Sequence, residues 1–176
     1  DITSIEGVLN GTTNFILKEM EDTGCVYADA LKEAQRLGIA ETNPNLDVEG
    51  FDTASKLLIL TNALMNTEKT MKDISIEGIT KLTSDDIKRA NSLNKKYKLI
   101  GKTEIVNNKL EMTVKLQLLD PSNPLYGVEG KNKAVRYISD TLGELTIIGG
   151  ASGVTPAAAS ILRDIININR GYKFVK

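Results

Sequence analysis

The chain has 176 residues, of which 41% are hydrophobic and 26% charged, a composition typical of one soluble globular domain over residues 1–176. Its 22 basic and 23 acidic residues give a net charge of -1, which excludes a general affinity for nucleic acid or acidic membranes. The absence of histidine and the single cysteine, Cys25, exclude His-dependent nucleophile systems and an internal disulfide, and we expect no metal site.

Membrane insertion and export are not indicated either. No apolar run approaches the ~18 residues that a membrane-spanning helix needs. The start of the sequence lacks the basic and apolar segments of a secretory signal. We therefore expect a cytoplasmic protein, in which any acid–base chemistry is carried out by Lys, Asp, Glu or Tyr.

The first half of the chain is predicted to be mainly helical. Residues 1–8 alternate as a strand and lead into a turn over residues 10–14, rich in helix-capping side chains. Helical spacing of apolar residues then predicts a helix that stops at Gly24 and a second helix that stops at Gly38. A polar loop over residues 39–50 should follow. The second helix is expected over residues 27–37. After the loop, we expect a helix over residues 48–65, a strand over 74–79 and a helix over 83–97.

The second half is predicted to be mainly sheet. Residues 99–106 and 110–119 flank Asn107-Asn108, a hairpin-type turn. Shorter strands over residues 134–139 and 144–148 precede a glycine-rich turn and a final helix over residues 155–167. Because helices concentrate early and strands late, we expect an α+β fold of two layers, a mixed and mainly antiparallel sheet with helices packed on one face.

The helix over residues 48–65 carries the first candidate chemistry. Asp52 and Lys56 are four residues apart and therefore point to almost the same side. The pair is either an idle ion pair on a solvated first turn or a proton-donating site. Residues 57–60 are all apolar, which indicates burial on every side and weakens the first reading, since the pKa of a partly buried lysine is then adjustable. Both readings stay open on the chemistry alone.

Two further carboxylates precede this helix. Glu41 and Asp47 lie in the polar loop that leads into it, so both could converge with Asp52 and Lys56 at the helix N-terminus. Three carboxylates suit a substrate that bears an ammonium group, and a lysine can protonate a developing alkoxide. The same residues could equally be surface acids of a polar loop.

Residues 34–56, AQRLGIAETNPNLDVEGFDTASK, resemble throughout their length the motif of homoserine dehydrogenases. Residues 6–14, EGVLNGTTN, are similar to the segment through which that family begins this domain. The glycine-rich turn at residues 149–153 and the alanine-rich helix after it are also similar. The resemblance therefore spans essentially the whole chain.

The resemblance implies an NAD(P)-dependent reduction of aspartate 4-semialdehyde to homoserine, on the route to threonine, methionine and isoleucine. It implies that Lys56 donates the proton, that Glu41 and Asp52 hold the substrate, and that Asp47 supports them. Gly38 and Gly153 match glycines that let the cofactor approach the backbone, a role that suits a residue without a side chain. It also implies a homodimer.

The sequence departs from the family pattern at two places. Many relatives carry an aromatic residue where this chain has Ile39, which implies a different wall of the site. The family's Gly-x-Gly-Ala-Gly turn is here Gly149-Gly150-Ala-Ser-Gly153.

A dinucleotide-binding fingerprint, Gly-x-Gly-x-x-Gly between a strand and a helix, is absent from the sequence. The resemblance implies that the nucleotide-binding domain would precede Asp1, together with a second active-site lysine and the carbonyls that bind a monovalent cation. We therefore expect the isolated chain to be inactive. The alternatives are a non-enzymatic amino-acid-binding or dimerisation module of the same fold, and a reductase with another substrate.

Overall fold

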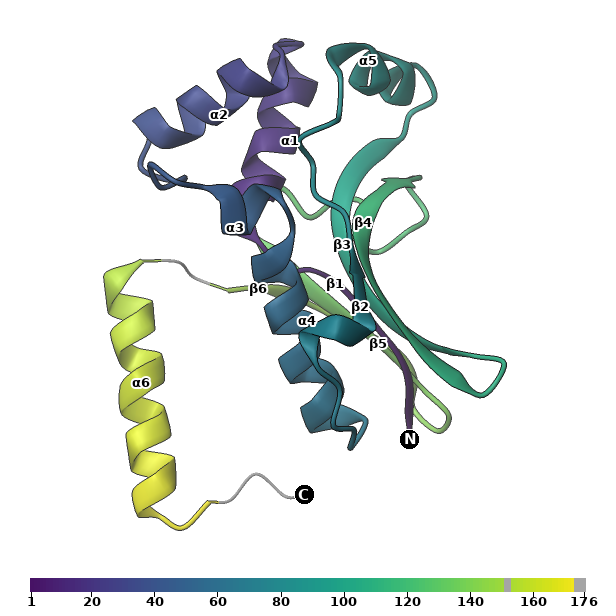
Figure 1. The fold of residues 1–176 in the computed structure, drawn as a ribbon, viewed down its shortest axis with the longest axis vertical. Helices are drawn as coiled ribbons and strands as arrows, with labels where there is room; N and C mark the ends of the chain where they lie inside the picture. The colour runs from purple at the N-terminus through teal and green to yellow at the C-terminus, as the bar shows by residue number, and fades with distance from the viewer. Residues whose placement is uncertain (151–152, 173–176) are drawn as a thin grey trace.

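The computed structural model describes residues 1–150 and 153–172. In this part of the chain, six strands form one sheet in the order β2-β4-β3-β1-β5-β6 (Figure 1). Only β2 and β4 pair in parallel; every other neighbouring pair is antiparallel. This arrangement confirms the mixed, mainly antiparallel sheet. The strands are β1 (Ile2–Val8), β2 (Ile74–Ile76), β3 (Lys96–Val106), β4 (Lys109–Leu119), β5 (Lys133–Ser139) and β6 (Gly143–Gly149).

The helices lie mainly on one face of this sheet, as expected of an α+β fold (Figure 1). They are α1 (Gly11–Thr23), α2 (Tyr27–Arg36), α3 (Asn45–Val48), α4 (Phe51–Leu64), the 3-10 turn η1 (Met71–Asp73), α5 (Ser84–Ser92) and α6 (Val154–Asn169). Helix α6 follows β6 and stands away from the other helices, and none of its described side chains is buried. No helix in the described ranges combines the length and apolarity needed to cross a bilayer.

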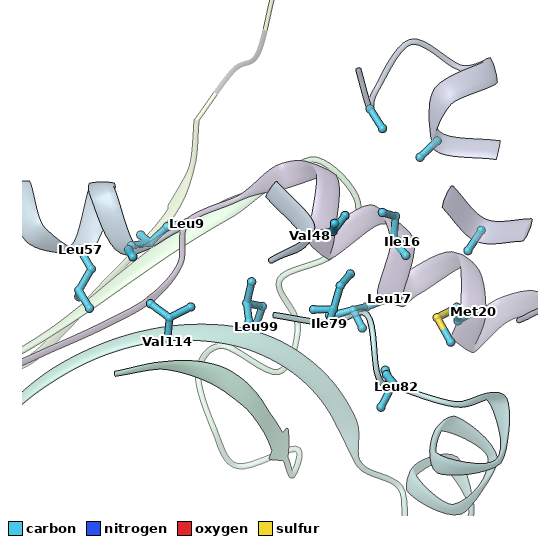
Figure 2. Packing of buried hydrophobic residues seen from close by; sticks show 14 of the residues in the cluster. Leu9, Ile16, Leu17, Met20, Val48, Leu57, Ile79, Leu82, Leu99 and Val114 are labelled. Atoms are coloured by element: carbon cyan, nitrogen blue, oxygen red, sulfur yellow. The ribbon is translucent and has the colours of Figure 1, made fainter. Parts of the chain in front are cut away.

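The main core lies between the helices and the sheet. Helix α1 contributes Ile16 and Met20, and the sheet contributes Leu99 and Val114 (Figure 2). Helix α4 can approach β3 closely at Gly101, because a β-carbon there would lie 3.1 Å from the Thr53 methyl group. This contact fixes α4 on the sheet. The opposite face carries a second, smaller cluster: Val8, Ile100, Leu119, Leu125, Val128 and Ala134.

Several element boundaries differ from the prediction. The residues predicted as a turn after Asn10 form the first turn of α1, with Asn10 as its N-cap. The predicted loop before α4 contains the short helix α3, and α4 begins at Phe51 because Gly50 adopts a left-handed conformation with φ 90°. Helix α5 ends at Ser92, not at residue 97, since Asn94 has a φ of 55° and turns the chain into β3.

The prediction that α4 is buried on every side is wrong. Leu57 is completely buried and its neighbours Leu58 and Leu60 are partly buried, but Ile59 is 67% exposed. The helix has one face against the sheet and a mainly apolar solvent-facing stripe that includes Phe51, Ser55 and Ile59. Periodicity alone therefore did not show which face was covered.

Candidate active site

The ion pair predicted on α4 is present at the start of that helix. Asp52 Oδ2 lies 2.6 Å from Lys56 Nζ, and the same ammonium group donates a second hydrogen bond of 3.3 Å to the carbonyl oxygen of Leu9. The Lys56 side chain is 43% exposed. Two acceptors from α4 and from the end of β1 thus hold the ammonium in place, while a substrate can still reach it.

Asn10 joins the two aspartates of this region. Its side-chain amide donates to Asp47 Oδ1 at 2.6 Å and to Asp52 Oδ2 at 2.7 Å. The side-chain oxygen of Asn10, Oδ1, accepts from the backbone N–H of Thr13 at 2.8 Å and so caps α1. Asn10 is only 4% exposed. One buried side chain therefore fixes α1, α3 and α4 relative to one another.

These groups line a pocket of about 350 Å³. Its walls come from the β1–α1 junction, from α3 and α4, from the segment leading into β5, and from both glycines predicted to bind the cofactor. The lining residues are Asn10, Gly11, Thr12, Gly38, Ile39, Asp47, Asp52, Lys56, Lys131, Lys133 and Gly153. Segments far apart in the sequence thus meet around one acid–lysine pair.

Glu41 lies beside this pocket and does not line it. It borders a neighbouring hollow of about 290 Å³, which also has Asp47 and Asp52 in its wall. Glu41 is exposed. Of the four predicted residues, the structure brings Asp47, Asp52 and Lys56 into one pocket and leaves Glu41 on the far side of the two aspartates.

Gly38 and Gly153 leave bare backbone at the pocket wall. Their φ angles are 67° and 118°, and a β-carbon built at either position would meet no atom of the described residues within 4 Å, its chain neighbours aside. The neighbouring residues 151 and 152 of the glycine-rich turn lie outside the described residues. The pocket wall at both glycines therefore presents backbone without a side chain.

Lys133 is a pocket residue that the sequence analysis missed. It is the first residue of β5, and its pKa is lowered mainly by burial and further by the positive charge of Lys56, whereas Asp52 raises it. No sequence pattern marked it, because only the sheet order brings β5 next to the N-terminal end of α4. Together with Lys131, Lys133 adds two further lysines to the wall of the pocket that contains Lys56.

A larger hollow of about 630 Å³ lies at the other end of α4, next to Leu64 and Met65. Its only charged wall residues are Asp1 and Lys69. Within the described ranges, no group of three or more His, Cys, Asp or Glu residues could hold a metal ion. The smaller pocket, by contrast, is lined by two aspartates and three lysines, Asp47, Asp52, Lys56, Lys131 and Lys133.

Comparison with known proteins shows the family to which the chain belongs. The family model described as homoserine dehydrogenase matches residues 1–166. The chain belongs to the homoserine dehydrogenase family. A NAD(+)-dependent homoserine dehydrogenase of Pseudomonas canavaninivorans is 41% identical over 170 residues, which are 96% of this chain and 48% of that protein.

Solved homoserine dehydrogenase structures share the fold. The Staphylococcus aureus enzyme at pH 8.5 superimposes with a TM-score of 0.90 and 35% identity, over 98% of this chain and 43% of that chain. A hyperthermophilic archaeal homoserine dehydrogenase mutant in complex with NADPH gives a TM-score of 0.81 and 28% identity, over 99% of this chain and 50% of that one. The chain therefore spans half or less of the homoserine dehydrogenases it matches.

Proposed function

We propose that the chain is the catalytic and dimerisation domain of an enzyme that interconverts aspartate 4-semialdehyde and homoserine. The observation that carries the proposal is the pocket in which Lys56, paired with Asp52, stands beside Asp47 and two bare glycine backbones. Family membership supports the same reaction. A small, soluble substrate agrees with the modest volume of the pocket, and we place the enzyme in the cytoplasm.

Lys56 is the proposed proton donor. Reduction of an aldehyde adds a hydride to carbon and a proton to oxygen, so the oxygen needs a donor within hydrogen-bond reach. An ammonium group held by Asp52 and by the Leu9 carbonyl has a fixed position and still carries a third N–H. That N–H is the one we assign to the substrate oxygen.

Asp52, Asp47 and Glu41 are the proposed ammonium-binding residues. Asp47 Oδ1 and Asp52 Oδ2 each accept one hydrogen bond from Asn10, which leaves other lone pairs of both carboxylates available to a substrate. Glu41 borders the same two aspartates from the neighbouring hollow. We propose that it contributes by charge from the pocket rim.

The cofactor is proposed to be NAD(P), which supplies the hydride when bound. Among the relatives, one is named as NAD(+)-dependent and one is in complex with NADPH. Gly38 and Gly153 would leave room for its ring at the pocket wall. We propose that most of the cofactor is bound by a part of the protein outside these 176 residues, because this sequence has no dinucleotide-binding fingerprint.

The test of Lys56 uses the intact protein and two substitutions. Lys56→Ala is expected to lower kcat for aspartate semialdehyde about 10²–10⁴-fold, the range for loss of a general acid. Lys56→Arg preserves the charge beside Asp52 but does not release a proton near neutral pH, so it should be nearly as impaired.

Lys32→Ala is the matched control. Like Lys56, Lys32 is a helical lysine paired with an aspartate of the same helix, Asp29, but it is exposed and lies outside the pocket. Its kcat should equal that of the unchanged enzyme. Unimpaired turnover of Lys56→Ala would reduce the Asp52–Lys56 pair to a structural role. Homoserine binding without any turnover would favour a non-enzymatic amino-acid-binding module.

A further inference from the structure

Lys133 points into the site because of its place in β5. Side chains alternate between the two faces of a strand. Val135 and Tyr137, two and four residues further on, pack against the core beneath the helices, whereas Ala134 belongs to the cluster on the opposite face. Lys133 therefore lies on the helix-covered face, at the end of β5 that borders the pocket.

The glycine-rich turn lies beside the stem of this lysine. Lys133 pairs with Gly149 across β5 and β6. A β-carbon at Gly150 would lie 3.9 Å from Lys133 Cδ. The stem thus passes along backbone that carries no side chain, and the ammonium group is close enough to Lys56 and Asp52 to interact with both charges.

The pocket consequently has an acidic side and a basic side. Asp47 and Asp52 form the acidic side, and the ammonium of Lys56 is held by Asp52 and by Leu9. Lys133 is partly buried near a like charge, an arrangement that disfavours its own charged form. An anion bound at Lys133 would offset that penalty.

We infer that Lys133 binds the α-carboxylate of the amino-acid substrate. This inference rests on the proposed function, since both homoserine and aspartate semialdehyde carry an α-ammonium and an α-carboxylate. The ammonium would face Asp47 and Asp52, the carboxylate would face Lys133, and the reacting oxygen would reach Lys56. Lys133 then selects amino acids over amines and alcohols that lack the carboxylate.

The experiment uses the intact enzyme and two inhibitors of semialdehyde reduction, homoserine and its neutral amide. Lys133→Met should raise the inhibition constant of homoserine about 10- to 100-fold, because one hydrogen bond between charged groups is lost. The inhibition constant of the amide should stay within about threefold. Homoserine and its amide carry the same ammonium group, so the ratio of their inhibition constants in each protein reports the carboxylate alone.

Lys133→Arg should keep most of the preference for homoserine, and Lys133→Gln replaces the methionine variant if that protein does not fold. Lys109→Met is the matched control, an exposed lysine that is likewise the first residue of a strand. Equal losses for homoserine and its amide, or an unchanged constant for homoserine, would overturn the inference.

A rise confined to the KM of NAD(P)H would assign Lys133 to a cofactor phosphate and would also overturn the inference. Failure of the unchanged intact enzyme to reduce aspartate semialdehyde would instead overturn the proposed function. The two failures are therefore distinguishable.

Discussion

Asn10 couples a helix cap to the geometry of two carboxylates, and these roles can be separated. Asn10→Asp keeps an oxygen for the Thr13 N–H but replaces the amide that donates to Asp47 and Asp52 with a third carboxylate. We expect kcat/KM of the intact enzyme to fall about 10²-fold through misplacement of these groups.

Asn10→Ala should in addition lower the free energy of unfolding by about 1 kcal/mol through loss of the cap. Urea unfolding and steady-state kinetics of both variants distinguish the two roles. Asn91→Asp, an exposed asparagine on α5, is the control. Full turnover of Asn10→Asp would show that the amide bridge has no functional role.

Lys98 presents a different residue-scale problem, because its ammonium group is buried on β3. It is 1% exposed and donates to Val128 O at 2.5 Å and to Asn14 Oδ1 at 3.1 Å. Burial, with a smaller contribution from the nearby charge of Lys96, lowers the pKa of Lys98 to about 8. The other charged groups that act on its pKa are Glu129 and Glu21, which raise it, and Lys18, which lowers it.

The low pKa of Lys98 predicts a rise in stability at alkaline pH. Below pH 8 both folded and unfolded chains carry the proton, so the folded state bears the full cost of burying it. Between pH 8 and 10.5 the folded chain has released the proton and the unfolded chain has not, so stability increases with pH.

Relative to Lys98→Met, the unchanged protein should gain on the order of 2–3 kcal/mol in unfolding free energy between pH 7 and 10. Urea unfolding at both pH values measures this difference. Lys109→Met, at an exposed site, should show no such trend. Parallel pH profiles for the unchanged protein and Lys98→Met would contradict a buried, titrating lysine.

At the scale of elements, the position of α3 depends on a backbone contact at Gly78. A β-carbon there would lie 2.2 Å from Val48 O and 2.5 Å from Glu49 Cα, and neither atom is a flexible side-chain end. Gly78→Ala should therefore lower the free energy of unfolding by about 1–3 kcal/mol and displace α3 together with Asp47. Thermal unfolding and kcat/KM measure the two effects. Gly127→Ala, with no atom within 4 Å of its new methyl group, should change neither.

Element types could be predicted from the sequence more accurately than element ends. Helical spacing identified α1, α2 and α4, and the asparagine turn identified the β3–β4 hairpin, in which Asn107 and Asn108 both have positive φ. The four-residue helix α3 is too short to show a period. The exposure of Ile59 depends on which face of α4 meets the sheet, and this is decided by tertiary packing.

At the scale of the whole molecule, the order of the strands could not be read from local patterns. The first strand lies inside the sheet, between β3 and β5, and this pairing brings Asn10 and Lys133 to one pocket. Family resemblance pointed to Asp47, Asp52 and Lys56 because they follow one another closely in sequence. The place of Lys133 in the pocket and the bridging role of Asn10 depend on contacts between distant segments, which the spacing of residues in the sequence cannot predict.

The same view of the whole molecule predicts how activity is divided between parts of the protein. The 176 residues supply the proposed proton donor and acidic substrate site, yet they contain no dinucleotide-binding fingerprint, and hydride transfer requires a bound nicotinamide. The isolated chain should therefore show no NAD(P)H oxidation with aspartate semialdehyde, while the intact protein should show it. Absorbance at the nicotinamide band measures both, with circular dichroism to establish that the isolated chain is folded. Turnover by the folded chain alone would mean that these residues bind the whole cofactor, and it would overturn the proposed division of the cofactor site between two parts of the protein.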